Sequence, residues 1–291
     1  MSGTLVALSP HLDDAVFSIG AFLHEQVRRG ADVHVVTVFA NDPAANGPAG
    51  SWDAACGFES AAAAARARQA EDRRACTIIG AQPHWLPYRD DTYGPRADDN
   101  EVWGSIRGLI GGCDLLLVPG FPLRHGDHVW VARLVVRRQR ELPCGLGFYG
   151  EQPYASAALA RRGRREVTPP QPLAEDAGTI RFERIPAAAT DRRAKIKASL
   201  QYRSQLRPLG ASALLRAYLD ERLRGGELVG WTAGASRAAP DDAAQHGAAA
   251  APDRRSGPLV GGSGEAGGES GERAERVGER AFESFDDEQG V

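Results

Sequence analysis

Short apolar runs alternate with segments of helical spacing through the first 150 residues. Thr4–Ser9 (TLVALS) and Val33–Ala40 (VHVVTVFA) are short and rich in β-branched residues, which is typical of buried strands. Between them, before a glycine, apolar residues recur at intervals of three or four: Val16, Ile19, Leu23 and Val27. This spacing predicts a strand, a helix and a second strand in succession.

The same alternation continues as far as residue 150. The predicted helices span Glu59–Ile79, Glu101–Ile110 and Asp127–Arg140. The predicted strands span Pro83–Tyr88, Asp114–Pro119 and Gly145–Gly150. Strands that alternate with helices imply right-handed crossovers. The expected fold class is therefore α/β, with a Rossmann-like, mostly parallel sheet and helices on both faces.

The pattern is weaker after Glu151. Residues 155–178 are rich in Ala, Arg and Pro, which predicts an irregular loop. Beyond it we expect a strand at Thr179–Ile185, a helix from a cap at Thr190 or Asp191 to about Leu206, before Pro208, and a helix at Ala211–Leu223. From residue 233 onward few apolar residues occur, which is typical of a disordered tail. The chain therefore divides into a domain at 1–232 and a tail at 233–291.

Composition narrows the class of protein. With 291 residues, 42% of them hydrophobic, the chain can bury the core of one large domain. A formal charge of -3, without a conspicuous positive stripe, argues against a nucleic-acid partner. No apolar run reaches membrane-spanning length and no signal peptide is evident, so we expect a cytoplasmic protein without membrane insertion. The four scattered cysteines suggest reduced thiols, which leaves His and carboxylates for any metal chemistry.

A group of ionisable residues follows the first predicted strand. His11, Asp13 and Asp14 lie where an open α/β sheet collects its ligands, beyond the carboxyl end of a strand. A nucleotide-binding turn at this place would be rich in glycine, and this one reads Pro-His-Leu-Asp-Asp. Two carboxylates would repel a phosphate and attract a cation. The sequence therefore favours a metal site here.

A second group follows the apolar strand DLLLVP. His125, Asp127 and His128 lie between the end of that strand and the next helix. Because the carboxyl ends of parallel strands share one edge of a sheet, the two groups can meet there. Two His and one Asp would leave one position open, as in a catalytic Zn²⁺ site. Each Asp taken alone could equally be a helix cap, so that explanation stays open.

At these residues the chain resembles the PIG-L/LmbE-like family of zinc-dependent N-deacetylases, which act on N-acetylglucosamine-type sugars, pseudodisaccharide thiols and antibiotic intermediates. The family carries an A-H-P-D-D-E motif after the first strand and an H-x-D-H motif further on. This chain has SPHLDDA at residues 9–15 and HGDH at residues 125–128, in the same order. The resemblance extends over about residues 3–208 and implies an LmbE-like fold.

The resemblance also implies roles for single residues. His11, Asp14 and His128 would be the ligands of Zn²⁺, with Fe²⁺ as the alternative metal in vivo. Asp13 would be the general base that activates the zinc-bound water.

The second motif is expected to act on the acyl group. His125, charged through its contact with Asp127 and oriented by it, would stabilise the oxyanion or protonate the leaving amine. Some family members carry a Tyr two positions before H-x-D-H, and this residue is Leu123 here, so Arg124 would share in stabilising the oxyanion and binding substrate. Arg68 would be a further substrate-binding residue. Its alternative interpretation is an ion pair with Glu71, three residues further along the same helix.

The expected function is a metal-dependent hydrolase that removes an N-acetyl or other N-acyl group from an amino sugar or glycosylated small molecule. The family motif is altered at two positions, to Leu12 and Ala15, a variant that resembles a subgroup with tailoring enzymes of secondary metabolism. Two other functions fit the same residues: a two-metal phosphoesterase, and a non-catalytic sugar-binding α/β module.

Overall fold

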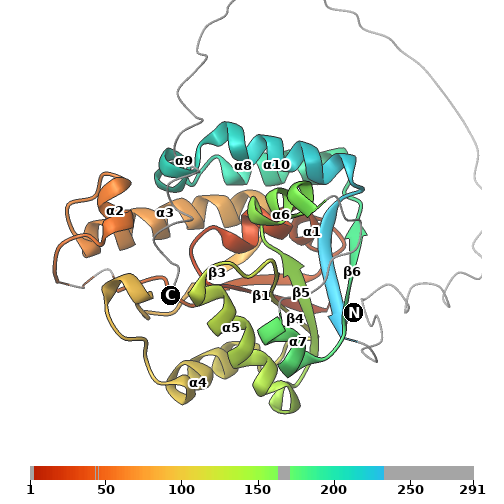
Figure 1. Cartoon of the computed structure of the whole chain (residues 1–291), viewed down its shortest axis with the longest axis horizontal. Helices are drawn as coiled ribbons and strands as arrows, with labels where there is room; N and C mark the ends of the chain where they lie inside the picture. Colours follow the sequence, from red (N-terminus) through yellow and green to blue (C-terminus); the bar gives the residue numbers. More distant parts are fainter. Residues whose placement is uncertain (1–2, 43, 45, 163–170, 233–291) are drawn as a thin grey trace, which may run out of the picture. The chain divides into compact units, whose positions relative to one another are not determined.

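The computed structural model describes residues 3–42, 44, 46–162 and 171–232 (Figure 1). These residues belong to one compact unit, Met1–Arg237, and the predicted tail at 233–291 lies outside the described residues. Within them the sheet has seven strands: β1 (Thr4–Ser9), β2 (Asp32–Thr37), β3 (Gln82–Trp85), β4 (Leu115–Phe121), β5 (Gly145–Gly150), β6 (Ile180–Ile185) and β7 (Glu227–Thr232).

The strand order is β3-β2-β1-β4-β5-β7-β6. The first five strands in this order are parallel, and β7 runs antiparallel to both of its neighbours. The order reverses between β1 and β4, which is the point where open α/β sheets bind their ligands. The predicted α/β class with a mostly parallel sheet is confirmed.

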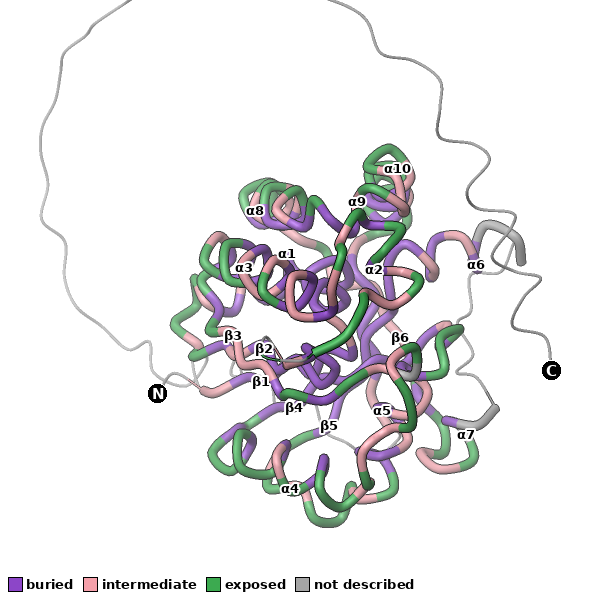
Figure 2. The backbone as a smooth tube through the Cα atoms, turned by 90° about the vertical axis from the view of Figure 1, so that its left-hand side faces the viewer, coloured by how far each residue is buried: buried purple, intermediate pink, exposed green. Residues whose placement is uncertain are grey.

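Helices cover both faces of the sheet (Figure 1). The described α-helices are α1 (Asp14–Arg28), α2 (Ser51–Ala55), α3 (Ala61–Ile79), α4 (Asp99–Ile110), α5 (Gly126–Arg137), α6 (Tyr154–Arg162), α7 (Gln171–Ala177), α8 (Ala189–Ser199), α9 (Arg203–Leu209) and α10 (Ala211–Leu223). Because side chains alternate along β1, Leu5 and Ala7 pack into the core with α1, α3, α8 and α10, whereas Val6 and Leu8 pack into the core with α4, α5 and α7. Figure 2 shows α8 and α10 outside α1 and α3, with exposed outer surfaces.

Several predicted boundaries change after Glu151. The predicted loop at 155–178 contains most of α6 and α7, so that prediction is wrong in its described part. The long helix expected up to about Leu206 is two helices, α8 and α9, and Ala188 occupies the N-cap position instead of Thr190 or Asp191. Asp191 lies in the first turn and forms an ion pair with Arg28 of α1. Strand β7 was not predicted, because Gly225 and Gly226 precede it and Gly230 interrupts its short apolar run.

The prediction of four reduced thiols is wrong for one pair. Cys113 and Cys144 form a disulfide, with Cα atoms 5.8 Å apart, whereas Cys56 and Cys76 are free and buried. The bonded pair precedes β4 and β5, whose parallel pairing brings their starting points together. The two cysteines are 31 residues apart along the chain, so their pairing could not be predicted from the local sequence. None of the helices in the described part of the chain is long and apolar enough to cross a membrane.

A buried group of charged residues interrupts α1 near its middle. Ile19 leaves helical geometry (φ -129, ψ 23), and the backbone N–H groups of Ala21 and Phe22 donate to the Glu227 carboxylate at 3.0 and 2.7 Å. Lys195 Nζ donates to the carbonyl oxygen of Ser18 at 3.0 Å. The side chains from α8 and β7 therefore satisfy backbone groups that the bend in α1 releases.

Candidate active site

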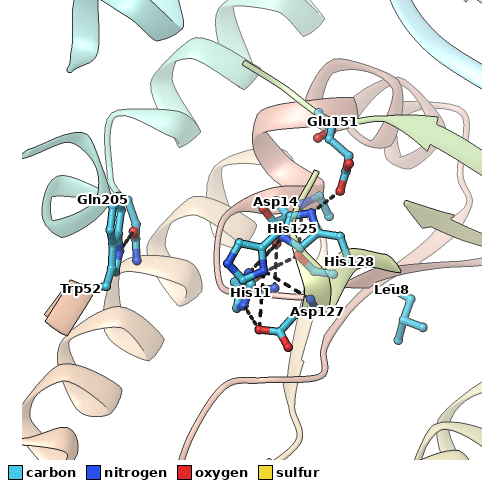
Figure 3. A network of polar contacts seen from close by, with 12 residues as sticks. Leu8, His11, Asp14, Trp52, His125, Asp127, His128, Glu151 and Gln205 are labelled. Atoms are coloured by element: carbon cyan, nitrogen blue, oxygen red, sulfur yellow. Dashed lines mark hydrogen bonds and ion pairs between the residues drawn. The ribbon is translucent and has the colours of Figure 1, made fainter. Parts of the chain in front are cut away.

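The two predicted motifs meet at the switch point of the sheet. His11 follows β1, and His125 and His128 follow β4, the neighbouring strand. Figure 3 shows these three imidazoles gathered with Asp14 and Asp127 at the carboxyl edge of the sheet. One ring nitrogen from each of the three His residues lies within 4.8 Å of the others.

A smaller triangle of polar atoms lies inside this group. His11 Nδ1 is 3.1 Å from His128 Nε2 and 3.3 Å from Asp14 Oδ2. The third side, from His128 Nε2 to Asp14 Oδ2, also measures 3.3 Å. The structure therefore brings together the three residues predicted to bind the metal.

The triangle has the size of one face of a tetrahedral metal site. Zn²⁺ binds His nitrogen and carboxylate oxygen at about 2.0–2.2 Å, so two ligand atoms at the tetrahedral angle are about 3.3–3.6 Å apart. The observed separations of 3.1–3.3 Å are slightly shorter than this. One carboxylate and two imidazoles also match the donor atoms that Zn²⁺ and Fe²⁺ accept. The residues present thus fit a single divalent ion with an open fourth position.

Carboxylates orient both of the imidazoles in the triangle. Glu151 Oε1 contacts His128 Nδ1, and Asp127 Oδ2 lies 3.1 Å from His11 Nε2. Each ring therefore turns its other nitrogen toward the triangle. Metal-binding His residues commonly have a carboxylate in this position, which fixes the tautomer and the ring orientation.

Glu151 was missed in the sequence. It is buried at the end of β5, and its other carboxylate oxygen accepts the backbone N–H of Leu123 at 2.9 Å. That bond holds Leu123 in the left-handed region at φ 54, an uncommon conformation for a leucine. The sequence did offer one signal for Glu151: an acidic residue that directly follows β5, a parallel strand whose carboxyl end lies at the same edge of the sheet as those of β1 and β4.

His125 lies beside the triangle. Its ring centroid is 5.1 Å from that of His11 and 5.2 Å from that of His128. Nδ1 of His125 accepts the backbone N–H of Asp127 at 3.3 Å, whereas the Asp127 carboxylate is 3.7 Å away and forms an ion pair with Arg96 at 2.6 Å. Asp127 thus contacts His125 most closely through its backbone.

The expectation of a charged His125 is not supported. Partial desolvation, together with His11 and His128, lowers the pKa of His125 to about 4. Because its Nδ1 accepts a hydrogen bond, the single proton of the neutral ring is on Nε2. His125 is therefore a neutral hydrogen-bond donor at neutral pH.

Asp13 is buried at the N-cap position of α1, but its side chain forms no capping hydrogen bond. Capping therefore does not account for Asp13. Burial and the adjacent Asp14 carboxylate raise the pKa of Asp13 to about 7. A carboxylate with a pKa near neutrality is well suited to accepting and returning a proton.

Asp14 and His11 shift each other's pKa values in opposite directions. Burial alone would raise the pKa of Asp14, but His128 and His11 lower it well below its ordinary range. Burial alone would lower the pKa of His11, but hydrogen bonds with Asp127 and Asp14 raise it to about 9. The site thus attracts positive charge and, with no metal present, binds protons instead.

The two predicted substrate-binding arginines lie in different surroundings. Arg68 is buried on α3 and forms an ion pair with Asp53. The alternative pair with Glu71 does not form, because Glu71 accepts the backbone N–H and the hydroxyl of Ser204, at 3.0 and 2.6 Å. Arg124 is exposed in the loop before His125.

Comparison with known proteins gives one family and a set of similar structures. Residues 6–138 match the PIG-L family, described as GlcNAc-PI de-N-acetylase. The A40926 pseudoaglycone deacetylase Dbv21 is 26% identical, with a TM-score of 0.62 over 78% of this chain and 96% of its own. The zinc-inhibited form of teicoplanin deacetylase Orf2 is 25% identical, with a TM-score of 0.63 over 78% and 97%.

A triple mutant of the deacetylase of the teicoplanin biosynthetic pathway is 26% identical, with a TM-score of 0.64 over 79% of this chain and 97% of its own. No curated protein sequence matches the chain.

Proposed function

Since residues 6–138 of this chain match the PIG-L family, we propose that the chain is a metal-dependent hydrolase that removes an N-acetyl or other N-acyl group. The observation that carries this proposal is the triangle of His11, Asp14 and His128, with sides of 3.1–3.3 Å. The metal, Zn²⁺ or Fe²⁺, would polarise the acyl carbonyl and lower the pKa of a water molecule.

The proposed substrate is an N-acylated amino sugar or another glycosylated small molecule. The similar structures are deacetylases of teicoplanin and of the A40926 pseudoaglycone, which supports a glycosylated substrate and a role in secondary metabolism. Arg68 and Arg124 are the proposed substrate-binding residues. A cytoplasmic location remains a prediction, and the disulfide between Cys113 and Cys144 weighs against a strongly reducing compartment.

Proton transfer is assigned to Asp13. The attacking water gives its proton to Asp13 as its oxygen bonds to the acyl carbon. The same proton then moves to the amide nitrogen as the carbon–nitrogen bond breaks, which releases the amine and acetic acid. The acid gives its remaining proton to solvent and becomes acetate. A pKa of about 7 for Asp13 suits both transfers.

His125 is assigned to the oxyanion. Its neutral ring carries the proton on Nε2 and can donate a hydrogen bond to the negative oxygen of the tetrahedral intermediate. This replaces the charged His125 inferred from the motif and does not require a second proton source. Leu123 is buried and stands in place of a tyrosine, so the proposal assigns this role to His125 together with Arg124.

The proposal is tested by acetate release. Metal-free protein is reconstituted with Zn²⁺ or Fe²⁺, one equivalent at a time, and incubated with N-acetylglucosaminides and an N-acetylated glycopeptide. We expect acetate from one or more of these amides, none from the metal-free protein, and inhibition by excess Zn²⁺ if the metal behaves as in the zinc-inhibited relative.

Phosphate monoesters in the same assay test the phosphoesterase alternative. Phosphate release together with two bound metal equivalents would favour the two-metal enzyme. Tight sugar binding without turnover at any metal loading would favour the binding module.

A further inference from the structure

Exposed leucines concentrate on one layer of the molecule. Among the described residues, the large apolar side chains that are exposed are Leu109, Leu200, Leu215, Leu219 and Leu223. Four of these five follow residue 188, on α10 or at the C-cap of α8. Figure 2 shows both helices on the outside of the fold. An apolar group of this kind at the surface usually marks an interaction site.

The leucines of α10 form a single row. Leu215, Leu219 and Leu223 follow one another at intervals of four, with exposed fractions of 45%, 54% and 77%. At about 100° per residue, Leu215 and Leu223 lie about 40° to either side of Leu219. Arg216 and Arg222 lie about 60° to either side, and both are exposed. The outer face of α10 is therefore an apolar row bordered by arginine on each side.

The whole layer is cationic. Residues 189–224 contain nine Lys or Arg against three Asp or Glu, whereas the full chain has a formal charge of -3. The three acidic residues are already paired: Asp191 with Arg28, Asp220 with Arg224, and Glu221 with Lys195. These basic residues are spread over α8, α9 and α10, and Lys195 among them is buried.

We propose that the α8–α10 layer docks on an anionic lipid surface. The leucine row would enter the boundary between headgroups and acyl chains, while Arg216 and Arg222 extend sideways to the phosphates. Each basic residue near such a surface adds attraction that falls off within a Debye length. This is surface binding by an amphipathic helix, and it is compatible with the finding that no described helix can span a membrane.

Two other occupants fit the layer less well. A second copy of the chain, packed through the same face, would bring arginines against arginines, since the acidic residues there are already paired. A nucleic acid would use the arginines but would leave the leucine row in water. An anionic bilayer satisfies both the charge and the apolar row.

Vesicle cosedimentation tests the proposal on the full chain. Vesicles of phosphatidylcholine, with and without 30 mol% phosphatidylglycerol as the probe, are compared at low and high salt. We expect binding only to the anionic vesicles, weakened by salt. The variant L215Q/L219Q/L223Q should bind at least tenfold more weakly, and R216Q/R222Q should lose most of the salt-sensitive binding. Leu109→Gln is the matched control on α4 and should bind like wild type.

Four results would overturn the proposal: no binding to anionic vesicles, equal binding to neutral vesicles, wild-type binding by the leucine variant, or a leucine-dependent dimer in solution with no lipid binding. Leucine-independent binding to duplex DNA in place of lipid would assign the layer to nucleic acid. Acetate release from a soluble substrate should be the same in the leucine variant and in wild type. This readout keeps the lipid proposal separate from the proposed hydrolase activity.

Discussion

Two buried polar clusters lie along α1, one at its middle and one at its start. They differ in whether a lysine ammonium group lies among the buried carboxylates. The cluster at the middle of the helix contains Lys195, whose ammonium group lies 3.0 Å from Glu221 and 2.8 Å from Glu227. The cluster at the start of the helix contains Asp14 and two imidazoles. Both clusters bury carboxylates, but in the second the groups that balance Asp14 are two imidazoles in place of an ammonium group.

The comparison shows how a structural polar cluster differs from a functional one. At the Lys195 cluster one ammonium group lies between two carboxylates, and burial together with Glu227 raises the pKa of Glu221 to about 7. The backbone groups released by the bend in α1 are bonded. At the edge of the sheet, neutrality requires protons on His11 and His128, whose pKa values are both raised. A divalent cation can replace those protons, since metal binding and proton release are coupled.

The largest expected effect comes from Asp13, which lies beside the edge cluster but outside the triangle. Asp13→Asn removes the proton acceptor and should lower kcat by a factor on the order of 100 to 10,000. The bound metal should remain, because the three atoms of the triangle are untouched. Single-turnover acetate release and metal analysis of the same sample measure both properties. Normal turnover by this variant would remove Asp13 from the mechanism.

The next largest effect is on the free energy of unfolding, at the Lys195 cluster in the middle of α1. Lys195→Met leaves Glu221 and Glu227 buried without the cation that lies between them, and breaking such a buried ion pair costs about 3–5 kcal/mol. Urea unfolding measures the loss. Arg224→Gln, which breaks the partly exposed pair with Asp220, is the control and should cost less than about 1 kcal/mol. Adding Glu221→Gln to Lys195→Met should recover part of the stability. A Lys195 variant as stable as wild type would contradict this description.

A smaller effect is expected at the carboxylate behind His128. Glu151→Gln can keep the bond to the Leu123 backbone but no longer stabilises the imidazole with a full negative charge. Metal affinity should fall about 10- to 100-fold, the usual cost of losing such a partner. Competition with a fluorescent chelator measures it. Glu101→Gln, an exposed change in the first turn of α4, should leave the affinity unaltered. Equal affinities in the two variants would remove Glu151 from the metal site.

The smallest effect concerns pH and the metal-free protein. His11 has a folded-state pKa of about 9, above its ordinary value of 6.5, so the stability it contributes is complete below about pH 6.5 and is lost as the pH rises through 9. The raised pKa of Asp13, about 7 against 3.8, acts in the same direction over a lower range. The metal-free protein should therefore lose stability between pH 6 and pH 9.5.

Urea unfolding with chelator present measures this loss, and saturating metal should abolish it. In the Asp13→Asn variant, the part of the stability loss that comes from the titration of Asp13, between about pH 4 and pH 8, should disappear. A metal-free protein that gains stability as the pH rises would contradict the assigned direction.

Local pattern was enough to predict part of this molecule. The bounds of β1 and β5, and of α10, agree with the sequence prediction because each is a short run with its own apolar periodicity and a clear end. Gly80, left-handed at φ 73, ends α3 as its sequence position indicates. Such features depend on neighbouring residues only.

Contacts between distant segments were harder to predict. His11 and His128 were predicted to meet because each follows a parallel strand, and that rule needs only the strand order. The partner of His128, Glu151, depends on the exact end of β5, and Glu227 reaches the backbone of α1 across 206 residues. No local pattern encodes a contact of that length. The leucine row of α10 was visible in the sequence, but only the fold shows which side of the helix is exposed.

Metal stoichiometry in two variants tests the ligand set most directly. The wild-type protein and His125→Ala should each hold one equivalent of Zn²⁺ or Fe²⁺ after dialysis, whereas Asp14→Asn should hold none. That result identifies His11, Asp14 and His128 as the ligands. Full retention in Asp14→Asn with loss in His125→Ala would assign the ion to the three imidazoles instead and contradict the triangle as the metal site.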